Sequence, residues 1–167
     1  MARQRMIRPE IWESLQVNCL NDFEFRVYMG LISNADDHGR LSGNPIILTA
    51  KIFPLINQQS LPAKVQFAVI YMEALRDETD NTPLVGIYQA KNEIIVFHPK
   101  WKSHQIIAEK RRAPSKLPEP PSPQAYKKDR TNVSAYGYKL LLKLRIATVN
   151  GSDNVRDSSF GSDYRMG

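Results

Sequence analysis

The chain has 167 residues, a formal net charge of +6, 11 prolines and one cysteine. This length allows one well-buried domain with an extension rather than two domains. The lone Cys19 excludes an internal disulfide. Because the sequence shows neither a signal-peptide pattern nor an apolar run of about 18 residues, we expect a cytoplasmic protein with no membrane contact.

The charges divide the chain into an acidic body and basic flanks. Residues 1–8 carry +3, residues 9–97 carry −5 and residues 98–145 carry +9. Lysine and arginine side chains that neutralise phosphates release counterions, so this segregation favours a polyanionic partner, with nucleic acid as the first expectation. The alternative is that the basic flanks simply keep an acidic body soluble.

Two helical segments are predicted near the N-terminus. Residues 9–12 suit a short helical turn with proline near its start, which Trp12 should anchor. Asn21, with Glu24 three residues later, forms a capping-box pattern. The helix that this box starts should run to about Ala35.

A turn and a short helix follow. Asp36, Asp37 and Gly39 should end the preceding helix, because aspartate caps turns and glycine adopts the left-handed conformation without strain. Asn44, followed by proline, predicts the start of a short helix that proline stops after Phe53. The buried face expected for this helix comprises Ile46, Ile47, Ala50 and Phe53.

The most apolar helix is predicted from Ser60 or Leu61 to about Arg76. On a helical wheel the expected buried arc comprises Phe67, Ile70, Tyr71, Ala74 and Leu75, whereas the opposite side comprises Gln66, Val69, Glu73 and Arg76. The apolar arc is wide for a surface helix. We expect it to be buried core, and the alternative is a contact patch for a second copy of the chain.

The remaining chain is predicted as a hairpin and a basic tail. β-Branched runs at 84–88 and 94–97, separated by turn residues, predict a β-hairpin. The prolines that follow predict an extended linker without a compact core. The alternating segment 136–149 fits a cationic strand and an amphipathic helix equally well. The expected divisions are a domain at 1–105, a Pro-rich basic linker at 106–135, a short amphipathic element at 136–150 and a disordered tail at 151–167.

Several strings occur in an order that resembles a known family. They are Arg5-Met6-Ile7-Arg8-Pro9, Ala35-Asp36-Asp37-His38-Gly39-Arg40, Ile52-Phe53-Pro54, the hairpin, Trp101 with His104-Gln105, and Pro114-Ser115-Lys116-Leu117-Pro118. Over about the first 120 residues the chain is similar to the N-terminal winged-helix domain of phage and prophage replication-initiation proteins, the replisome organisers related to DnaD. The resemblance implies recognition of a replication origin in the bacterial cytoplasm, and host replication proteins, the helicase or its loader, as partners.

The expected fold is therefore α+β and mainly helical: a winged helix-turn-helix with a C-terminal β-hairpin wing and a Pro-rich basic extended tail. In such a domain the third full helix enters the major groove of double-stranded DNA and the hairpin contacts the backbone. Glutamine can read adenine, and basic arms add non-specific affinity. The expected DNA-binding residues, each of which could instead be ordinary solvated surface, are Arg3, Arg5, Arg8, Gln58, Gln59, Lys64, Gln66, Lys91, Asn92, Lys100, Lys102, Lys110, Arg111, Arg112 and Lys116.

No pattern for catalysis is found. His38, His98 and His104 lack further ligands at metal-binding spacing, and no glycine-rich loop suits a phosphate. We therefore expect no enzyme, no metal and no cofactor. Besides a replication-initiation protein, the sequence allows a transcriptional regulator on the same scaffold. It also allows an adaptor that binds a host replication protein or itself.

Overall fold

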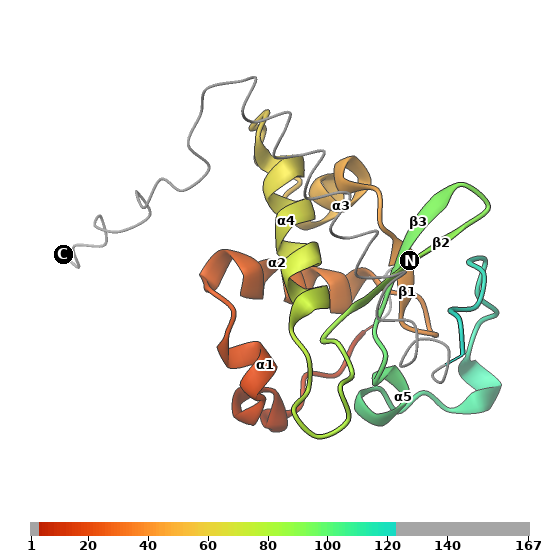
Figure 1. The fold of residues 1–167 in the computed structure, drawn as a ribbon. Coiled ribbons are helices and arrows are strands. Elements are labelled where there is room, and N and C mark those ends of the chain that lie inside the picture. The colour runs from red at the N-terminus through yellow and green to blue at the C-terminus, as the bar shows by residue number, and fades with distance from the viewer. Residues whose placement is uncertain (1–3, 123–167) are drawn as a thin grey trace.

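The structure, a computed structural model, describes residues 4–122 (Figure 1). Arg3 and the predicted segments at 136–150 and 151–167 lie outside the described residues. The fold is α+β and mainly helical, with one small antiparallel sheet. In chain order its elements are η1 (Pro9–Glu13), α1 (Leu15–Asn18), α2 (Asp22–Asn34), β1 (Arg40–Ser42), α3 (Pro45–Ile52), α4 (Leu61–Ala74), β2 (Gly86–Ala90), β3 (Glu93–Phe97), α5 (Trp101–His104) and η2 (Glu109–Arg111).

Helix α2 begins at the predicted capping box. The Asn21 side chain accepts a hydrogen bond of 2.9 Å from the backbone N–H of Glu24, and the Glu24 carboxylate accepts one of 3.0 Å in return. These two bonds satisfy amide groups that have no partner inside the helix. The helix ends at Asn34 with Ala35 as its C-cap, as the sequence predicts.

The turn after α2 depends on an aspartate and a glycine. The Asp36 carboxylate accepts hydrogen bonds of 2.9 Å from the backbone N–H groups of His38 and Arg40, which confirms the predicted capping role. Gly39 has a φ of +77°, and a Cβ at this position would lie 2.6 Å from Cγ of Trp101. Both the left-handed backbone and the close aromatic ring therefore require glycine here.

Helix α3 starts at Asn44, whose side chain caps the first turn as predicted. The predicted buried face is wrong apart from Phe53. The side chains that enter the core from α3 are Leu48, Thr49 and Ile52, whereas Ile46, Ile47 and Ala50 are exposed. Because apolar residues occupy most positions of this helix, the sequence pattern could not fix which side faces inward.

Helix α4 lies at the centre of the domain and packs against α2 and α3. Its Val69 is 4% exposed, so the buried-core interpretation of the wide apolar arc is confirmed at that position. The wheel prediction is also confirmed at Ile70, which is 4% exposed. It is wrong at Tyr71 and Ala74, which are exposed, and at Glu73, which is buried. Glu73 is tolerated inside because its carboxylate accepts a 2.7 Å hydrogen bond from Arg76, one turn further along.

The sheet has the strand order β1-β3-β2, with both pairs antiparallel. The predicted hairpin is confirmed as β2 and β3, and its turn is shorter than predicted. Ala90 pairs with Glu93, which leaves a two-residue turn. Strand β1 was not predicted, because three residues are too few to show an alternating pattern.

The two faces of the sheet are covered by different parts of the chain. Leu41, Ile87 and Val96 belong to the main core with the helices, whereas Tyr88, Ile95 and Phe97 form a second cluster on the other face. Leu117 packs against this second cluster. Residues 112–120, which we call the strap, contain no helix or strand and no fully buried residue, but Leu117 attaches them to the sheet.

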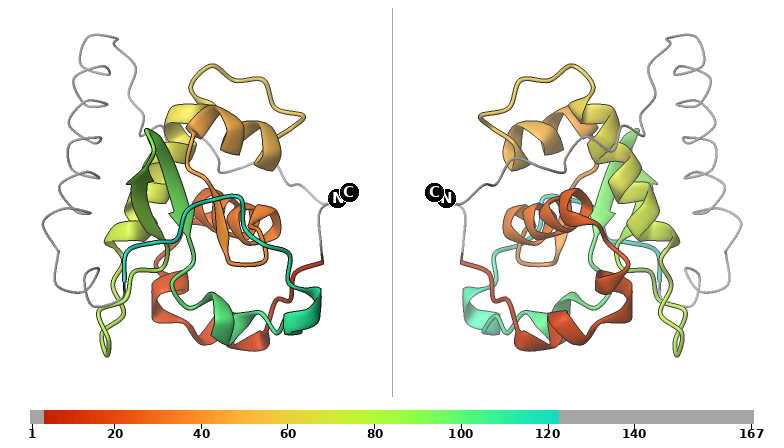
Figure 2. Two further views of the ribbon diagram at one scale, coloured as in Figure 1. Left: turned by 90° about the vertical axis from the view of Figure 1, so that its right-hand side faces the viewer. Right: turned by 90° about the vertical axis from the view of Figure 1, so that its left-hand side faces the viewer.

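The N-terminal segment folds as η1 and α1 below the helical layer (Figures 1 and 2). Trp12 is 64% exposed, so the prediction that it anchors this segment is wrong. Val17, which is 6% exposed, enters the core instead, and Ile11 packs against it. The Trp12 ring lies on the surface, 5.5 Å from the ring of Phe25.

The order of helix, strand, two helices and hairpin is compatible with a winged-helix-like fold. In residues 4–122, no helix is both long and apolar enough to cross a membrane.

Candidate nucleic-acid interface

The hairpin tip is built from two residues in left-handed conformations. Lys91 and Asn92 have φ values of 49° and 66°, the geometry of the tight turns that match the twist of paired strands. Both side chains are exposed. Lys91 makes no ion pair with any residue between 4 and 122, so its ammonium group can meet a phosphate.

The start of α4 supplies the second part of the interface. Gln58 and Gln59 are exposed in the loop before this helix, and Lys64 and Gln66 are half-buried in its first two turns. Figure 1 shows this end of α4 and the hairpin tip on the same side of the molecule. Six of the predicted residues lie on these two elements: Gln58, Gln59, Lys64 and Gln66 at the start of α4, and Lys91 and Asn92 at the hairpin tip. We call this region the hairpin end.

The rest of α4 presents a different surface. Its outward positions after the first turns are Phe67, which is half-buried, and the exposed Tyr71 and Ala74. None of them can donate to a phosphate or a base edge except through the Tyr71 hydroxyl, which donates to the carbonyl of Cys19 at 3.3 Å. The polar residues Lys64 and Gln66 therefore lie in the N-terminal part of α4, and the outward positions that follow are mainly apolar.

Four predicted cations lie at the opposite end of the molecule. Lys100, Lys102, Lys110 and Arg111 occupy α5, η2 and the residue before α5, which Figures 1 and 2 place away from the hairpin tip. Lys100 is engaged there, at 2.7 Å from Asp77 and 3.3 Å from Asp80. Burial alone would lower the pKa of Lys100, but its hydrogen bonds to these two carboxylates raise it.

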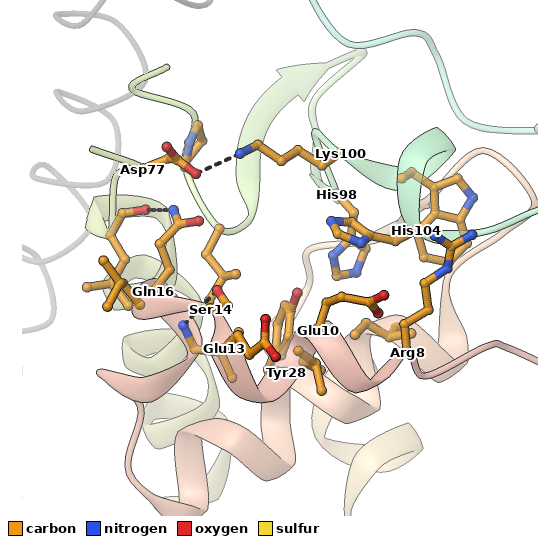
Figure 3. Close-up of a pocket in the computed structure, with 18 of the residues that line it drawn as sticks. Arg8, Glu10, Glu13, Ser14, Gln16, Tyr28, Asp77, His98, Lys100 and His104 are labelled. Atoms are coloured by element: carbon orange, nitrogen blue, oxygen red, sulfur yellow. Dashed lines mark hydrogen bonds and ion pairs between the residues drawn. The ribbon is translucent and has the colours of Figure 1, made fainter. Parts of the chain in front are cut away.

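Arg5 has a structural position that the sequence did not indicate. Its guanidinium lies 3.2 Å from the Asp37 carboxylate and donates to the carbonyl of Ala35 at 2.6 Å, with 7% of its side chain exposed. It also lies over the Trp101 ring, 5.4 Å from the ring centre. We therefore leave Arg5 out of the interface. Arg8, next along the N-terminal arm, lines a cavity together with residues of α1, α2 and α5 (Figure 3).

The turn at 36–40 holds the strap. Asp37 accepts a hydrogen bond of 2.9 Å from the backbone N–H of Ala113, and Asp36 accepts one from the Ser115 hydroxyl. Arg40 donates to the carbonyl of Leu117 at 2.9 Å. The turn and the Pro-rich segment, which are distant in sequence, therefore form one structural unit. Arg112 is half-buried and Lys116 is exposed within this unit.

Two cations that were not among the predicted DNA-binding residues lie on helices α2 and α3. Arg26 and Lys51 are exposed and line one groove between α2 and α3. Arg26 lies over the Phe53 ring, 4.5 Å from its centre. Arg26 lies on α2 and Lys51 on α3, and no sequence pattern indicates that these two residues line the same groove. In the described part of the chain no group of three His, Cys, Asp or Glu residues could hold a metal ion.

Comparisons of the chain with protein-family models, with curated proteins and with solved structures give no match. The resemblance to the replication-initiation proteins related to DnaD therefore stays a prediction from the residues.

Proposed function

We propose that the protein is a non-catalytic double-stranded DNA-binding protein that engages the duplex through its hairpin end. One observation carries this proposal: the start of α4 and the hairpin tip, which carry the polar and cationic residues named above, both lie in the upper part of Figure 1, in a domain whose element order is compatible with a winged helix. In this assignment β2 and β3 form the wing.

The chemistry of the hairpin end fits a duplex. In helix-turn-helix proteins the N-terminal residues of the recognition helix contact base edges. Gln58, Gln59 and Gln66 carry amides that can pair with adenine, and Lys64 can contact guanine or a phosphate. Lys91 at the tip of the hairpin would contact the flanking backbone, which positions the protein without reading sequence.

We further propose that the bound site is a replication origin of a phage or related mobile element. This step rests on the resemblance described above, and a transcriptional regulator would use the same surface. Mapping the bound sites separates the two, because a replication protein occupies an origin and a regulator occupies promoters.

The test begins with selection of bound sequences from a random duplex pool at near-physiological salt. Anisotropy titrations at several salt concentrations then compare Lys91→Ala with Lys102→Ala, an exposed lysine at the opposite end of the molecule. Loss of one phosphate contact should lower the salt slope by about one unit for Lys91→Ala and leave it unchanged for Lys102→Ala. Gln66→Ala should alter the selected sequence.

Two results would overturn the proposal. The first is a protein that shifts no duplex even at low salt. The second is a DNA affinity that falls in Lys102→Ala and is unchanged in Lys91→Ala, Lys64→Ala and Gln66→Ala. This result would mean that the duplex binds at the other end of the molecule.

A protein-interaction adaptor is the second candidate, and a specific surface favours it. Ile46 of α3 is 68% exposed and Leu55, in the loop before α4, is 97% exposed, with Ile47 and Ile56 exposed beside them. Exposed aliphatic groups in a cluster mark contact sites. Sedimentation of the protein and of Leu55→Ser tests self-association. A strictly monomeric protein that retains no host replication protein would exclude this role.

A further inference from the structure

Strand β2 lies at one edge of the sheet (Figure 1). In the part of the chain that the structure describes it pairs with β3 alone, so one side of its backbone has no neighbouring strand there. Proteins usually protect an exposed edge with prolines or charged side chains. The sequence of β2, Gly-Ile-Tyr-Gln-Ala, contains neither. The edge of β2 is therefore open to a further strand.

The outward backbone groups of this edge belong to Ile87 and Gln89. The Ile94 carbonyl of β3 accepts a 2.7 Å hydrogen bond from the residue after β1, so the even-numbered residues of β3 bond towards β1. Its odd-numbered residues bond towards β2, because hydrogen bonds to the two neighbours alternate along a strand. Tyr88 lies opposite Ile95 and so bonds to β3, whereas Ile87 and Gln89 alternate with it and point away. Their backbone groups make no other hydrogen bond to a residue between 4 and 122.

The strap carries the chain across the sheet towards this edge. The Ser115 hydroxyl donates to the carboxylate of Asp36, in the turn before β1. Three residues later, the Pro118 carbonyl accepts a hydrogen bond from the hydroxyl of Tyr88, on β2. Between these two points Leu117 packs on the outer face of the sheet. The strap therefore brings the chain to β2 shortly before residue 123, where the described part ends.

The sequence of segment 138–146, which lies outside the described residues, alternates as a strand for such an edge would. One set of alternate positions is apolar throughout, and the other holds three cations. The apolar set is Tyr138, Leu140, Leu142, Leu144 and Ile146, and the cations are Lys139, Lys143 and Arg145. A strand of this kind can pack one face on a core and keep the other in water. Residues 123–137 can span up to about 50 Å when extended, so the segment can reach β2 in either direction.

We propose that residues 138–146 add to β2 of the same chain as a fourth strand, through backbone hydrogen bonds to Ile87 and Gln89. Strand addition at a free edge is a recurrent mode of peptide recognition, in which main-chain hydrogen bonds supply affinity and alternate side chains supply specificity. The added strand places three cations of the tail beside the hairpin. The proposal does not depend on DNA binding, because it concerns contacts within the chain.

Amide hydrogen exchange of the full chain, followed in ¹H–¹⁵N spectra, tests the proposal at Gln89. This residue is exposed, so burial alone does not slow its exchange. The double variant Leu142→Pro/Lys143→Pro removes a donor to β2 whichever of the two residues faces it, because neighbouring residues of a strand point in opposite directions. The Gln89 amide should exchange about tenfold or more faster in this variant than in the wild type. The Tyr88 amide, which bonds to β3, should exchange at the same rate in both.

The matched control is Ser158→Pro/Ser159→Pro, which makes the same change outside the segment and should leave the exchange of Gln89 unaltered. Two measurements on the wild type complete the test. Backbone ¹³C chemical shifts of residues 138–146 should be those of a β-strand. The exchange of Gln89 should also be independent of protein concentration, because the strand comes from the same chain.

Each of three results would contradict the proposal. If Gln89 exchanges as fast in the wild type as in Leu142→Pro/Lys143→Pro, no strand adds to this edge. If the ¹³C shifts of residues 138–146 are helical, the segment has the other structure that its sequence allows. If the slow exchange of Gln89 is lost on dilution, a second copy of the protein supplies the strand. The two wild-type measurements remain decisive even if the double variant fails to fold.

Discussion

The hairpin end and the strap differ in whether their cationic side chains form ion pairs within the protein. At the hairpin end, Lys64 and Lys91 make no ion pair with residues 4–122, and Lys91 projects into solvent. Around the strap, Arg5 is held by Asp37, and Arg40 lies 3.5 Å from Glu119. The cations of the first region are free for a partner, whereas those of the second stabilise the fold.

This difference shows that the net charge of a segment does not reveal how many of its cations are already paired within the protein. Residues 98–145 carry +9, which suggests that the segment after the hairpin is the main polyanion-binding surface. In the structure Lys100 is paired with two aspartates and the strap is bound to the acidic turn at 36–40. A net charge counted along a chain therefore does not identify the cations that a partner can reach.

The largest expected effect comes from breaking the buried pair at the strap. In Asp37→Asn the guanidinium of Arg5 stays buried without a counter-charge, and the backbone N–H of Ala113 loses a carboxylate acceptor. The free energy of unfolding should fall by about 3 kcal/mol or more. Urea denaturation followed by circular dichroism measures this change.

The matched control is Glu119→Gln, which removes the partner of Arg40. Because the Glu119 side chain is 88% exposed, its loss should change the free energy of unfolding by less than about 0.5 kcal/mol. Equal effects of the two substitutions would contradict the division into buried and exposed pairs.

Acid should destabilise the protein through His98, whose ring stacks on that of Trp101. Its pKa is about 4 in the folded protein, against 6.5 for an unperturbed histidine. Above pH 6.5 the ring is neutral in both states and stability is unaffected. As the pH falls towards 4, His98 becomes protonated in the unfolded chain but stays neutral in the folded protein. The free energy of unfolding therefore declines by up to about 3 kcal/mol.

Urea denaturation at pH 7 and at pH 4.5, on wild type and on His98→Phe, isolates this effect. All other titratable groups are the same in the two proteins, so the difference between their pH dependences reports His98. Identical pH dependence in the two proteins would show that His98 is not held neutral by burial.

A smaller effect is expected from the apolar contact of the strap. Leu117 packs against the sheet cluster that contains Tyr88, Ile95 and Phe97. Because Leu117 is half-buried, Leu117→Ala should lower the free energy of unfolding by about 1–2 kcal/mol. Lys116→Ala, at the exposed neighbouring position, is the control. A strap that merely lies on the surface would make the two variants indistinguishable.

The smallest effect is expected at the free end of the hairpin. Asn92 has a φ of +66°, which glycine adopts without strain, so Asn92→Gly should raise the free energy of unfolding by about 0.5 kcal/mol. Thermal unfolding measures the gain. A loss of stability would mean that the Asn92 side chain supports the turn in a way that the structure does not record.

Local signals in the sequence were enough for the helix boundaries and the hairpin. The capping box at Asn21, the proline after Asn44 and the two β-branched runs each act through neighbours a few residues away, so their outcome needed no knowledge of the rest of the fold. The prediction of six polar residues at the α4 start and the hairpin followed from the same element order.

Tertiary structure alone decided which side of each helix is buried and which cations are free. Helices α3 and α4 are apolar around most of their circumference, so their phase was set by the elements that surround them. Arg5 and Asp37 are 32 positions apart and the turn and the strap more than 70, and contacts over such separations leave no periodic trace in a single sequence. Gln16 likewise joins α1 to the segment after α4, by hydrogen bonds to carbonyls 59 and 66 positions away.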